Sequence, residues 1–309
     1  MSLVLQGAII MDSRRLKEII RNSIFKPIVR VLFRIFPPFW LSICKQAYYL
    51  KAWPNLKNPQ RYNEKLLLYM DSELMESYYI YADKITVRDY VEKAVGSKYL
   101  AKLYAVYNKY EEIDLDNLPD KFYLKFNHGC GGHLPCFNKE TFTKEIIYKR
   151  AYINKKLAED YSEVFGERQY HKIKAKLFVE EMLEFDFPKG ALYRLYTFSG
   201  KVNFIKVTGT LSNGQIVSNH YDCQWNEIDK SFGYKREFCY FQKPNNLEEM
   251  IEVAEKLAAT FPFVRVDLYS FKDRIVFSEL TFTPAAASAP IFPKEWDYEL
   301  GKLFPYPFD

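Results

Sequence analysis

Apolar residues recur at helical spacing in several stretches of the chain. In the first stretch, residues 14–36, arginines and lysines fall largely between the apolar positions. This pattern predicts a basic amphipathic helix that is interrupted near Pro27 and ends at Pro37-Pro38. Two interpretations of the helix remain open. It either lies on an anionic membrane surface or packs on the globular body or on a second subunit.

The remainder of the chain mixes helical and extended patterns, after a loop rich in proline and asparagine at residues 53–62. Because helices and strands follow one another without a regular βαβ alternation, the order predicts α+β lobes rather than a doubly wound sheet. The predicted helices cover residues 63–84, 85–95, 139–158 and 246–260, and the predicted strands cover residues 99–106, 121–126, 175–183, 193–198, 202–209, 264–269 and 275–281.

Aromatic and other apolar side chains are abundant enough to fill a sizeable core. The 309 residues include 25 Tyr and 25 Phe, and 48% of them are apolar, which is enough for one large lobe or two modest ones. The net charge of +5 is too small to indicate nucleic-acid binding. It is compatible with an anionic partner such as a nucleotide, an acidic sugar or a membrane surface.

The cysteines do not form a recognisable metal or disulfide pattern. There are five, an odd number, and none forms a CxxC pair, which predicts reduced thiols in a cytoplasmic protein. Cys130 and Cys136 lie close to His128 and His133, but the spacing does not match the usual zinc ligand pairs. The sequence shows neither a signal peptide nor a run of 18 apolar residues, so we expect a cytoplasmic location, peripheral to the inner face of the plasma membrane if the amphipathic helix binds lipid.

A glycine-rich segment follows the strand predicted at residues 121–126. The strand carries Lys125, and the next segment contains Gly129, Gly131 and Gly132. Glycine backbones can approach a phosphate closely, successive N–H groups can hold its oxygens, and lysine adds a positive charge. The pattern is neither a P-loop nor a dinucleotide fingerprint. A phosphate site and an ordinary glycine turn therefore both remain possible for this segment alone.

The hairpin predicted across Lys272-Asp273 brings oxygen ligands together. Glu279 and Thr281 are two positions apart on one strand and therefore share a face, and Asp267 can face them from the partner strand. Two carboxylates and a hydroxyl suit Mg²⁺ held against phosphates. The alternative is a charged hairpin face without a ligand.

Two further segments fit a nucleotide site. A buried strand ends in Glu180-Glu181 followed by Met182 and Leu183, where an adenine could find apolar contacts and a ribose hydroxyl could find a carboxylate. Lys84 lies at a predicted loop-to-helix junction and could reach phosphates. A surface strand end and an exposed lysine are the alternatives.

The order of these pieces resembles the ATP-grasp superfamily and, more narrowly, the TupA-like ATP-grasp proteins of bacterial cell-surface polysaccharide and teichuronopeptide biosynthesis. The resemblance spans roughly Asn58 to Gly301. It rests on the segments NPQRYNEKL, ADKITVRDYV, LPDKFYLKFNHGCGG, FPFVRVDLY, VFSELTFTP and EWDYELG.

The resemblance implies an α+β ATP-grasp fold in which two α+β lobes sandwich ATP behind an N-terminal helical extension. The implied boundaries are 1–52 for the extension, 53–183 for the first lobe and 184–309 for the second. Two magnesium ions are implied, with Asp267, Glu279 and Thr281 as ligands. The implied nucleotide contacts are Lys84, Lys125, Asn127, His128, Gly129, Gly131, Gly132, Glu180, Glu181 and Leu183.

The resemblance also implies a ligase that joins a carboxylate to an amine through an acylphosphate. Lys125 and Arg265 would act in catalysis, and Arg194 and Arg265 would bind the carboxylate substrate. The implied partners are an acidic or lipid-linked glycan, an amine or amino acid, and an anionic membrane contacted by residues 12–45; no nucleic acid is expected. A glycosyltransferase-type capsule or O-antigen enzyme, a phosphotransferase and a non-catalytic nucleotide-binding protein remain alternatives.

Two positions depart from the superfamily pattern. Thr281 stands where ATP-grasp enzymes more often place Asn, although both side chains offer an oxygen ligand. Residues 285–288 read AAAS where a glycine-rich run is expected. Since alanine restricts the backbone more than glycine does, we expect the acceptor side of the site to be altered here.

Overall fold

The computed structural model describes residues 38–183, 189–233, 239–271 and 274–308. The predicted amphipathic helix at residues 14–36 lies outside these ranges. The helices are α3 (Pro38–Leu50), α4 (Tyr62–Asp71), α5 (Glu73–Ser77), α6 (Tyr79–Ala82), α7 (Val87–Ala94), α8 (Lys139–Leu157), α9 (Tyr161–Phe165), α10 (Leu247–Ala258) and α11 (Lys294–Leu303), with short 3-10 turns η2 (Ser97–Tyr99), η3 (Tyr110–Glu112), η4 (Arg168–Tyr170) and η5 (Pro284–Ala287).

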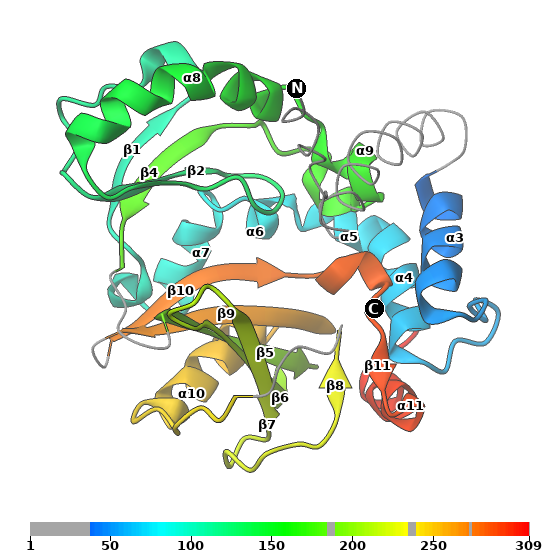
Figure 1. Ribbon diagram of the computed structural model, residues 1–309. Coiled ribbons are helices and arrows are strands. Elements are labelled where there is room, and N and C mark those ends of the chain that lie inside the picture. The colour runs from blue at the N-terminus through cyan, green and yellow to red at the C-terminus, as the bar shows by residue number, and fades with distance from the viewer. Residues whose placement is uncertain (1–37, 184–188, 234–238, 272–273, 309) are drawn as a thin grey trace, which may run out of the picture.

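The strands form two main antiparallel sheets and one short pair (Figure 1). The order is β1-β4-β2-β3 in the four-stranded sheet, β10-β9-β5-β6-β7 in the five-stranded sheet, and β11-β8 in the pair. Their bounds are β1 (Leu103–Tyr107), β2 (Phe122–Phe126), β3 (Leu134–Cys136), β4 (Leu177–Glu181), β5 (Lys189–Phe198), β6 (Lys201–Thr210), β7 (Ile216–Tyr221), β8 (Ser231–Phe232), β9 (Phe263–Phe271), β10 (Arg274–Thr281) and β11 (Ile291–Phe292).

Alternation along β2 gives the four-stranded sheet its two faces. Phe122, Leu124 and Phe126 are buried and belong to the same apolar cluster as Phe142 and Ile146 of α8, which covers the sheet in Figure 1. Side chains of a strand point alternately to opposite faces, so Lys125 of β2 projects away from α8, toward the second sheet.

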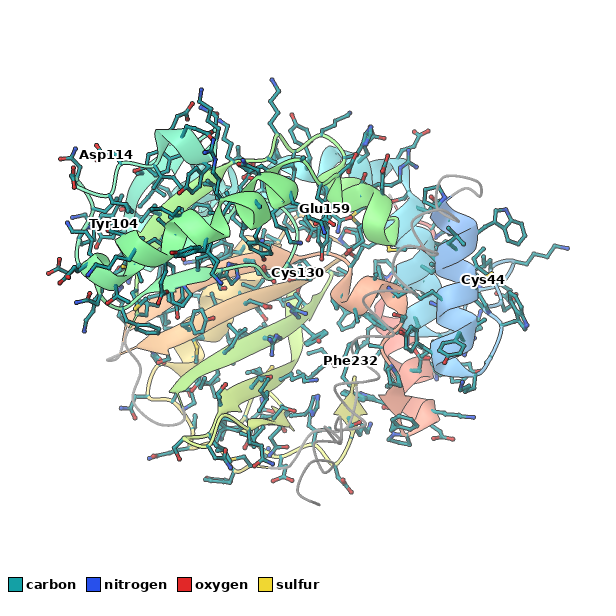
Figure 2. All side chains as sticks on the ribbon, turned by 45° about the horizontal axis from the view of Figure 1, so that its top comes forward. Cys44, Tyr104, Asp114, Cys130, Glu159 and Phe232 are labelled. Carbon is teal, nitrogen blue, oxygen red and sulfur yellow. The ribbon has the colours of Figure 1, made fainter. Side chains whose placement is uncertain are left out.

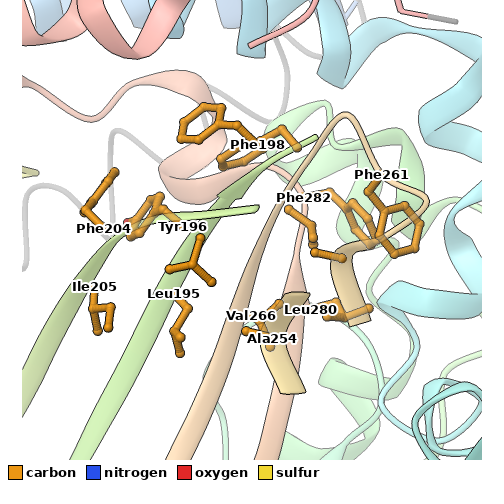
Figure 3. Packing of buried hydrophobic residues seen from close by; sticks show 14 of the residues in the cluster. Leu195, Tyr196, Phe198, Phe204, Ile205, Ala254, Phe261, Val266, Leu280 and Phe282 are labelled. Carbon is orange, nitrogen blue, oxygen red and sulfur yellow. The ribbon is translucent and has the colours of Figure 1, made fainter. Parts of the chain in front are cut away.

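The five-stranded sheet carries the larger core. Its β5–β6 hairpin turns at Ser199 (φ +47°) and Gly200 (φ +75°), as the sequence predicted, because a two-residue hairpin turn needs positive φ values. The helix α10 packs on this sheet, and its Ala254 belongs to the same apolar cluster as Val266 and Leu195, which Figure 3 labels.

This larger core also draws in the preceding helices. Ile43 of α3 and Tyr62 and Leu66 of α4 belong to the same apolar cluster as Phe198 and Phe263 of the five-stranded sheet. The cluster therefore joins residues from all three predicted segments, 1–52, 53–183 and 184–309, and those boundaries stay a prediction.

The single helix predicted over residues 63–84 is wrong: the segment forms α4, α5 and α6 instead. Ser72 has extended backbone angles (φ −69°, ψ 154°), and its hydroxyl accepts a hydrogen bond from the N–H of Met75. A serine that caps the next helix competes with continuation of the previous one. Across the ranges that the structure describes, no helix is both long enough and apolar enough to span a membrane.

Candidate functional site

A pocket of about 170 Å³ lies between the two main sheets. Both sheets contribute side chains to its wall, as the resemblance implies for a nucleotide held between lobes. The lining consists of Lys84, Arg88, Ala101, Tyr123, Lys125, His133, Phe178, Glu180, Glu181, Leu183, Tyr269, Val276, Phe277, Ser278 and Glu279.

The apolar part of the pocket comes from facing strands. Phe178 of β4 and Val276 and Phe277 of β10 line it together with Leu183. Flat apolar walls of this kind suit a heteroaromatic ring. Of the residues predicted to contact adenine and ribose, the pocket therefore brings together Leu183, Glu180 and Glu181.

The two glutamates of β4 have different partners. Glu180 forms an ion pair with Lys125 across the β2–β4 ladder. Glu181 accepts a hydrogen bond from Arg274 at 3.0 Å and another from the backbone N–H of Lys102 at 3.2 Å. Burial opposes ionisation, but these bonds hold the pKa of Glu181 below its ordinary value.

Lys84 links the glycine-rich segment to the carboxylates. Its Nζ donates to the carbonyl oxygen of Gly129 at 2.6 Å and lies 3.6 Å from Oε2 of Glu279. Lys84 and Lys125 both line the pocket, so two of the predicted phosphate-binding cations meet there. An anion entering the pocket would compete with Glu180 and Glu279 for these ammonium groups.

The first half of the segment 127–132 is anchored to the body of the protein. Asn127 is fully buried, and its Nδ2 donates to Asp83 at 2.9 Å and to the carbonyl of Lys174 at 3.0 Å. The ring of His128 lies 3.2 Å from the carbonyl of Lys156, and burial lowers the pKa of this imidazole. Neither side chain lines the pocket, so any contact of these two residues with a nucleotide would come from the backbone.

The three glycines have the backbone that the segment needs. Gly129, Gly131 and Gly132 have φ values of +65°, +74° and +81°, which side chains with a Cβ rarely adopt. Figure 2 shows Cys130 of this segment between the helical layer and the strands of the second sheet, with its Sγ 2.6 Å from the hydroxyl of Tyr161.

A matched pair of substitutions tests the segment. An added Cβ at Gly129 would lie 2.3 Å from Cδ2 of Tyr161, whereas at Gly131 nothing lies within 4 Å. Both Gly129→Ala and Gly131→Ala incur a left-handed backbone cost of about 1 kcal/mol, but only the first displaces the Tyr161 ring. We expect Gly129→Ala to weaken Mg-ATP binding at least tenfold more than Gly131→Ala in isothermal titration calorimetry. Equal effects would contradict this packing.

The carboxylate centre lies where three strands run side by side. Asp267 of β9 pairs with Glu279 of β10 on one side and with Arg194 of β5 on the other. A β-bulge at Ser278 shifts the register just before Glu279 and re-aims the strand there. The predicted oxygen ligands Asp267, Glu279 and Thr281 therefore do converge.

Arg265 occupies the middle of this centre. Its Nε and Nη2 each lie 2.6 Å from one oxygen of Asp267, and Nη2 also donates to Thr281 at 2.9 Å. Thr281 in turn donates its hydroxyl to Glu279 at 2.9 Å, and Nε of Arg194 lies 3.6 Å from Asp267. Nη2 of Arg265 also lies 3.4 Å from Oε1 of Glu279, so Arg265 pairs with both predicted metal-binding carboxylates.

The two carboxylates differ in exposure and in charge balance. The side chain of Asp267 is 1% exposed and that of Glu279 is 29% exposed. Burial raises the pKa of Asp267 against the opposing charge of Arg265. Burial acts the same way on Glu279, but Lys84 and Arg265 outweigh it and hold its pKa below the ordinary value. Glu279 is therefore an ionised carboxylate that faces the pocket.

The donor set fits magnesium in part. Among the described residues, no three His, Cys, Asp or Glu side chains gather as a metal cluster. Mg²⁺ is commonly held by one or two carboxylates with phosphate and water oxygens, and Glu279 with Thr281 and Asp267 matches that requirement. Asp267 can bind the metal only if Arg265 gives up part of its contact with the carboxylate of Asp267, since the guanidinium already contacts both carboxylate oxygens.

Several residues that line the pocket were missed by the sequence reasoning, among them Arg88, His133 and Tyr269. Burial and the charges of Lys125 and Lys84 lower the pKa of His133 to about 4, so the ring is neutral at neutral pH. The position of His133 directly after the glycine-rich segment was the available signal.

The run AAAS adopts the backbone that glycines would give. Ala285, Ala286 and Ala287 have φ values of +54°, +46° and +54°, which cost about 1–2 kcal/mol per residue. Gln46 of α3 holds this alanine turn by donating to the carbonyl of Ala287 at 2.7 Å, and the Ser288 hydroxyl donates to Ala285 at 2.7 Å. The alanines therefore adopt the backbone of a glycine run at a cost in strain. The hydrogen bonds of Gln46 and Ser288 stabilise this strained turn.

A buried carboxylate, Glu167, lies beside this turn. The hydroxyl of Thr283 donates to its Oε1, and Nε2 of Gln169 donates to the Thr283 hydroxyl at 2.7 Å. Burial raises the pKa of Glu167 to about 7. Local sequence gave no signal for it, because Thr283 is 116 positions away.

The raised pKa predicts a specific pH dependence of stability. Between about pH 4.5 and 7 the unfolded chain releases the Glu167 proton that the folded protein retains, so folding stability falls as pH rises through this window. The effect is at most about 3 kcal/mol, from 1.36 kcal/mol per pKa unit. Relative to Glu167→Gln, the wild type should lose stability over this window in urea denaturation at stepped pH. Parallel stability curves would contradict the assignment.

Comparison with known proteins gives a family and a set of similar folds. The model of the TupA-like ATP-grasp family matches residues 64–305. D-alanine–D-alanine ligase from Bacillus anthracis is 12% identical with a TM-score of 0.44, covering 74% of this chain and 71% of that one. The D-cycloserine synthetase DcsG is 10% identical with a TM-score of 0.44, covering 73% and 71%. The ATP-grasp ligase PsnB complexed with a minimal precursor is 12% identical with a TM-score of 0.39, covering 75% and 62%. No curated protein matches the sequence.

Proposed function

Since the chain belongs to the TupA-like ATP-grasp family, we propose that it is a Mg-ATP-dependent ligase that joins a carboxylate to an amine through an acylphosphate. Membership confirms the resemblance and the ATP-grasp fold predicted from the sequence, and it supports the predicted class of ATP-dependent enzyme. The observation that carries the proposal is the pocket between the two sheets, whose lining includes Lys84, Lys125 and Glu279.

The pocket divides into a base end and a phosphate end. Phe178, Phe277 and Leu183 would hold the adenine, and Glu180 or Glu181 would accept a hydrogen bond from the ribose. Lys84 and Lys125 would bind the phosphates at the other end, and the backbone N–H groups of Gly131 and Gly132 would donate further hydrogen bonds to them. This placement brings the γ-phosphate toward the carboxylate centre.

Magnesium, when bound, would neutralise phosphate charge, with Glu279, Thr281 and Asp267 supplying oxygens. Arg265 and Arg194 lie against the same carboxylates. When the metal takes over part of the Asp267 carboxylate, the guanidinium of Arg265 would be able to hold the substrate carboxylate through two hydrogen bonds. This would position the substrate for attack on the γ-phosphate. Both arginines carry positive charge where the acylphosphate forms, which favours phosphoryl transfer.

The proposed substrate class rests on the family setting. We propose a uronic-acid carboxylate of a cell-surface polysaccharide, or of its lipid-linked precursor, as the acceptor. An amino acid or another amine would supply the nitrogen. The net charge of +5 is compatible with an acidic glycan.

The decisive experiment is incubation with Mg-ATP, a panel of uronic acids and a panel of amines. Amide formation should require all three components and release ADP and phosphate. Release of AMP and pyrophosphate would exclude an acylphosphate route. Stabilisation by a sugar nucleotide and not by Mg-ATP, measured as a shift in Tm, would favour a glycosyltransferase instead.

Membrane contact through residues 12–45 is a separate part of the proposal. Triple charge reversal of Arg14, Lys17 and Arg21 to Glu should release the full-length protein from vesicles containing anionic lipid in a flotation assay. Each basic residue near such a surface contributes about 1 kcal/mol. Reversal of Lys144 and Lys149, exposed on α8, is the control. Equal flotation of all three proteins would remove the membrane from the proposal.

A further inference from the structure

The helix α3 has one face packed on the body of the protein and one face open to solvent. It lies at the edge of the described ribbon, beside α4, and its Ile43 and Gln46 are buried (Figure 1). Trp40, Cys44 and Tyr48 follow one another at four-residue spacing, so they share the open face, and all three are exposed (Figure 2). The packing that holds α3 in place therefore leaves large aromatic side chains in water.

Four aromatic residues gather on and next to this open face. The exposed fractions are 59% for Trp40, 64% for Tyr48, 41% for Tyr49 and 70% for Trp53, which follows the end of α3 by three residues. The rings of Tyr48 and Tyr49 lie 5.3 Å apart. We call these four residues the aromatic surface. Large apolar side chains that gather on a surface mark an interaction site, whereas single ones need no explanation.

The charge around the aromatic surface is positive. Residues 19–63 contain no aspartate or glutamate, and their eight basic residues are Arg21, Lys26, Arg30, Arg34, Lys45, Lys51, Lys57 and Arg61. Lys51 and Lys57 are exposed, and Nζ of Lys51 lies 4.4 Å from the ring centre of Tyr48. An anionic partner with an apolar layer therefore complements this part of the protein.

An anionic lipid bilayer has both properties. Tryptophan and tyrosine concentrate at the boundary between lipid and water, and lysines near the surface are attracted by acidic headgroups. A helix face suits a planar layer, whereas small ligands and sugars bind in concave pockets. The helix α3 also begins at Pro38, directly after the basic segment at residues 14–36. The aromatic surface is therefore continuous in sequence with the segment for which membrane contact is proposed.

We propose that the aromatic surface inserts into the headgroup layer of an anionic bilayer, with Lys51 and Lys57 on the lipid phosphates. This rests on the membrane contact proposed for residues 12–45 and extends it onto the folded body. Gln46, on the opposite face of α3, holds the alanine turn by donating to the carbonyl of Ala287 at 2.7 Å. The helix that supports the acceptor side is thus the one that meets the lipid.

Tryptophan emission of the full-length protein tests the insertion. Two of the four tryptophans belong to the aromatic surface, and the other two, Trp225 and Trp296, are only 8% and 4% exposed. Vesicles of phosphatidylcholine and brominated phosphatidylglycerol should shift the emission to the blue and quench it, because bromine quenches rings that enter the lipid. The double variant Trp40→Phe with Trp53→Phe should lose this quenching while remaining bound to the vesicles.

A second pair of substitutions tests the contribution to affinity. Tyr48→Ser combined with Trp53→Ser should weaken binding to these vesicles about tenfold or more in flotation, since it withdraws large apolar area from the lipid. Added salt should release this variant before the wild type, because screening removes the electrostatic attraction that remains. Phe137→Ser combined with Tyr148→Ser, at aromatic positions that are 66% and 86% exposed beside and on α8, is the matched control and should float as wild type.

The outcomes separate this proposal from the others. Flotation of the wild type without quenching, or equal flotation of the Tyr48→Ser and Trp53→Ser double variant, would overturn it and leave the basic segment as the membrane contact. Absence of flotation by the wild type would overturn both. These measurements require no turnover, so failure of the ligase function would appear separately, as absence of ADP and amide.

Other occupants of the aromatic surface would also be recognised. Protection of Trp40 and Trp53 from iodide before lipid is added would show that another part of the chain or a second copy covers them. An emission shift with soluble polygalacturonate and none with vesicles would assign the surface to an acidic glycan. Either result would overturn the proposal.

Discussion

Replacing Glu279 with glutamine should lower kcat about a thousandfold, because loss of one charge-stabilising group in a preorganised site costs 10²–10³ in rate. Glutamine keeps the shape of the side chain but removes the ionised carboxylate that faces the pocket beside Lys84. The rate is measured as ADP release under saturating Mg-ATP and substrates. Stability should change by only about 1 kcal/mol, since the side chain is 29% exposed.

The control for this substitution is Glu252→Gln, which removes an exposed carboxylate that pairs with Lys256 on α10. It should leave both the rate and the Tm within error of the wild type. Retention of wild-type turnover by Glu279→Gln would eliminate a ligase mechanism through this carboxylate. A fall in kcat that Mn²⁺ or higher Mg²⁺ partly restores would strengthen the assignment to metal binding.

Replacing Arg265 with methionine should destabilise the fold by about 3–5 kcal/mol, because it leaves a buried charge without its partner. Asp267 is 1% exposed, and both of its oxygens lie 2.6 Å from Arg265. Arg194, at 3.6 Å, offers only partial compensation. The free energy of unfolding is measured by urea denaturation at pH 7.

The double variant Arg265→Met with Asp267→Asn completes the thermodynamic cycle. It should be more stable than Arg265→Met alone, since the asparagine removes the uncompensated carboxylate. Additive losses in the two single variants would show that the pair does not act as a unit. Both single variants should lose activity, so stability and turnover together separate the structural role of the arginine from its role at the substrate.

Aromatic and β-branched content made the strands predictable. The strand predicted at residues 121–126 is β2 (Phe122–Phe126), and its alternate residues Phe122, Leu124 and Phe126 are buried. The division of residues 63–84 into three helices was not predictable from periodicity, because it depends on one serine cap. The strands β8 and β11 span two residues each, too short to give any periodic signal.

The site was predictable where neighbouring residues on one strand define it. Glu279 and Thr281 share a face because they are two positions apart, and the β9–β10 hairpin brings Asp267 beside them. Long-range contacts were not readable in this way. Glu167 meets Thr283 across 116 positions, and the Gln46 contact with Ala287 spans 241 positions. Neither position lies in a motif of its own.

The contact between Gln46 and the alanine turn ties the acceptor side to the start of the described chain. Gln46 lies eight residues after Pro38 on α3, which corresponds to about 12 Å along a helix. If the preceding basic segment rests on a bilayer, as proposed, the short length of chain between them keeps the acceptor side near the lipid headgroups. The enzyme would then select sugars by their position from the lipid, modifying the first residues of a growing chain and passing over distant ones. A flexible spacer inserted before Pro38 should lengthen the glycan that is modified.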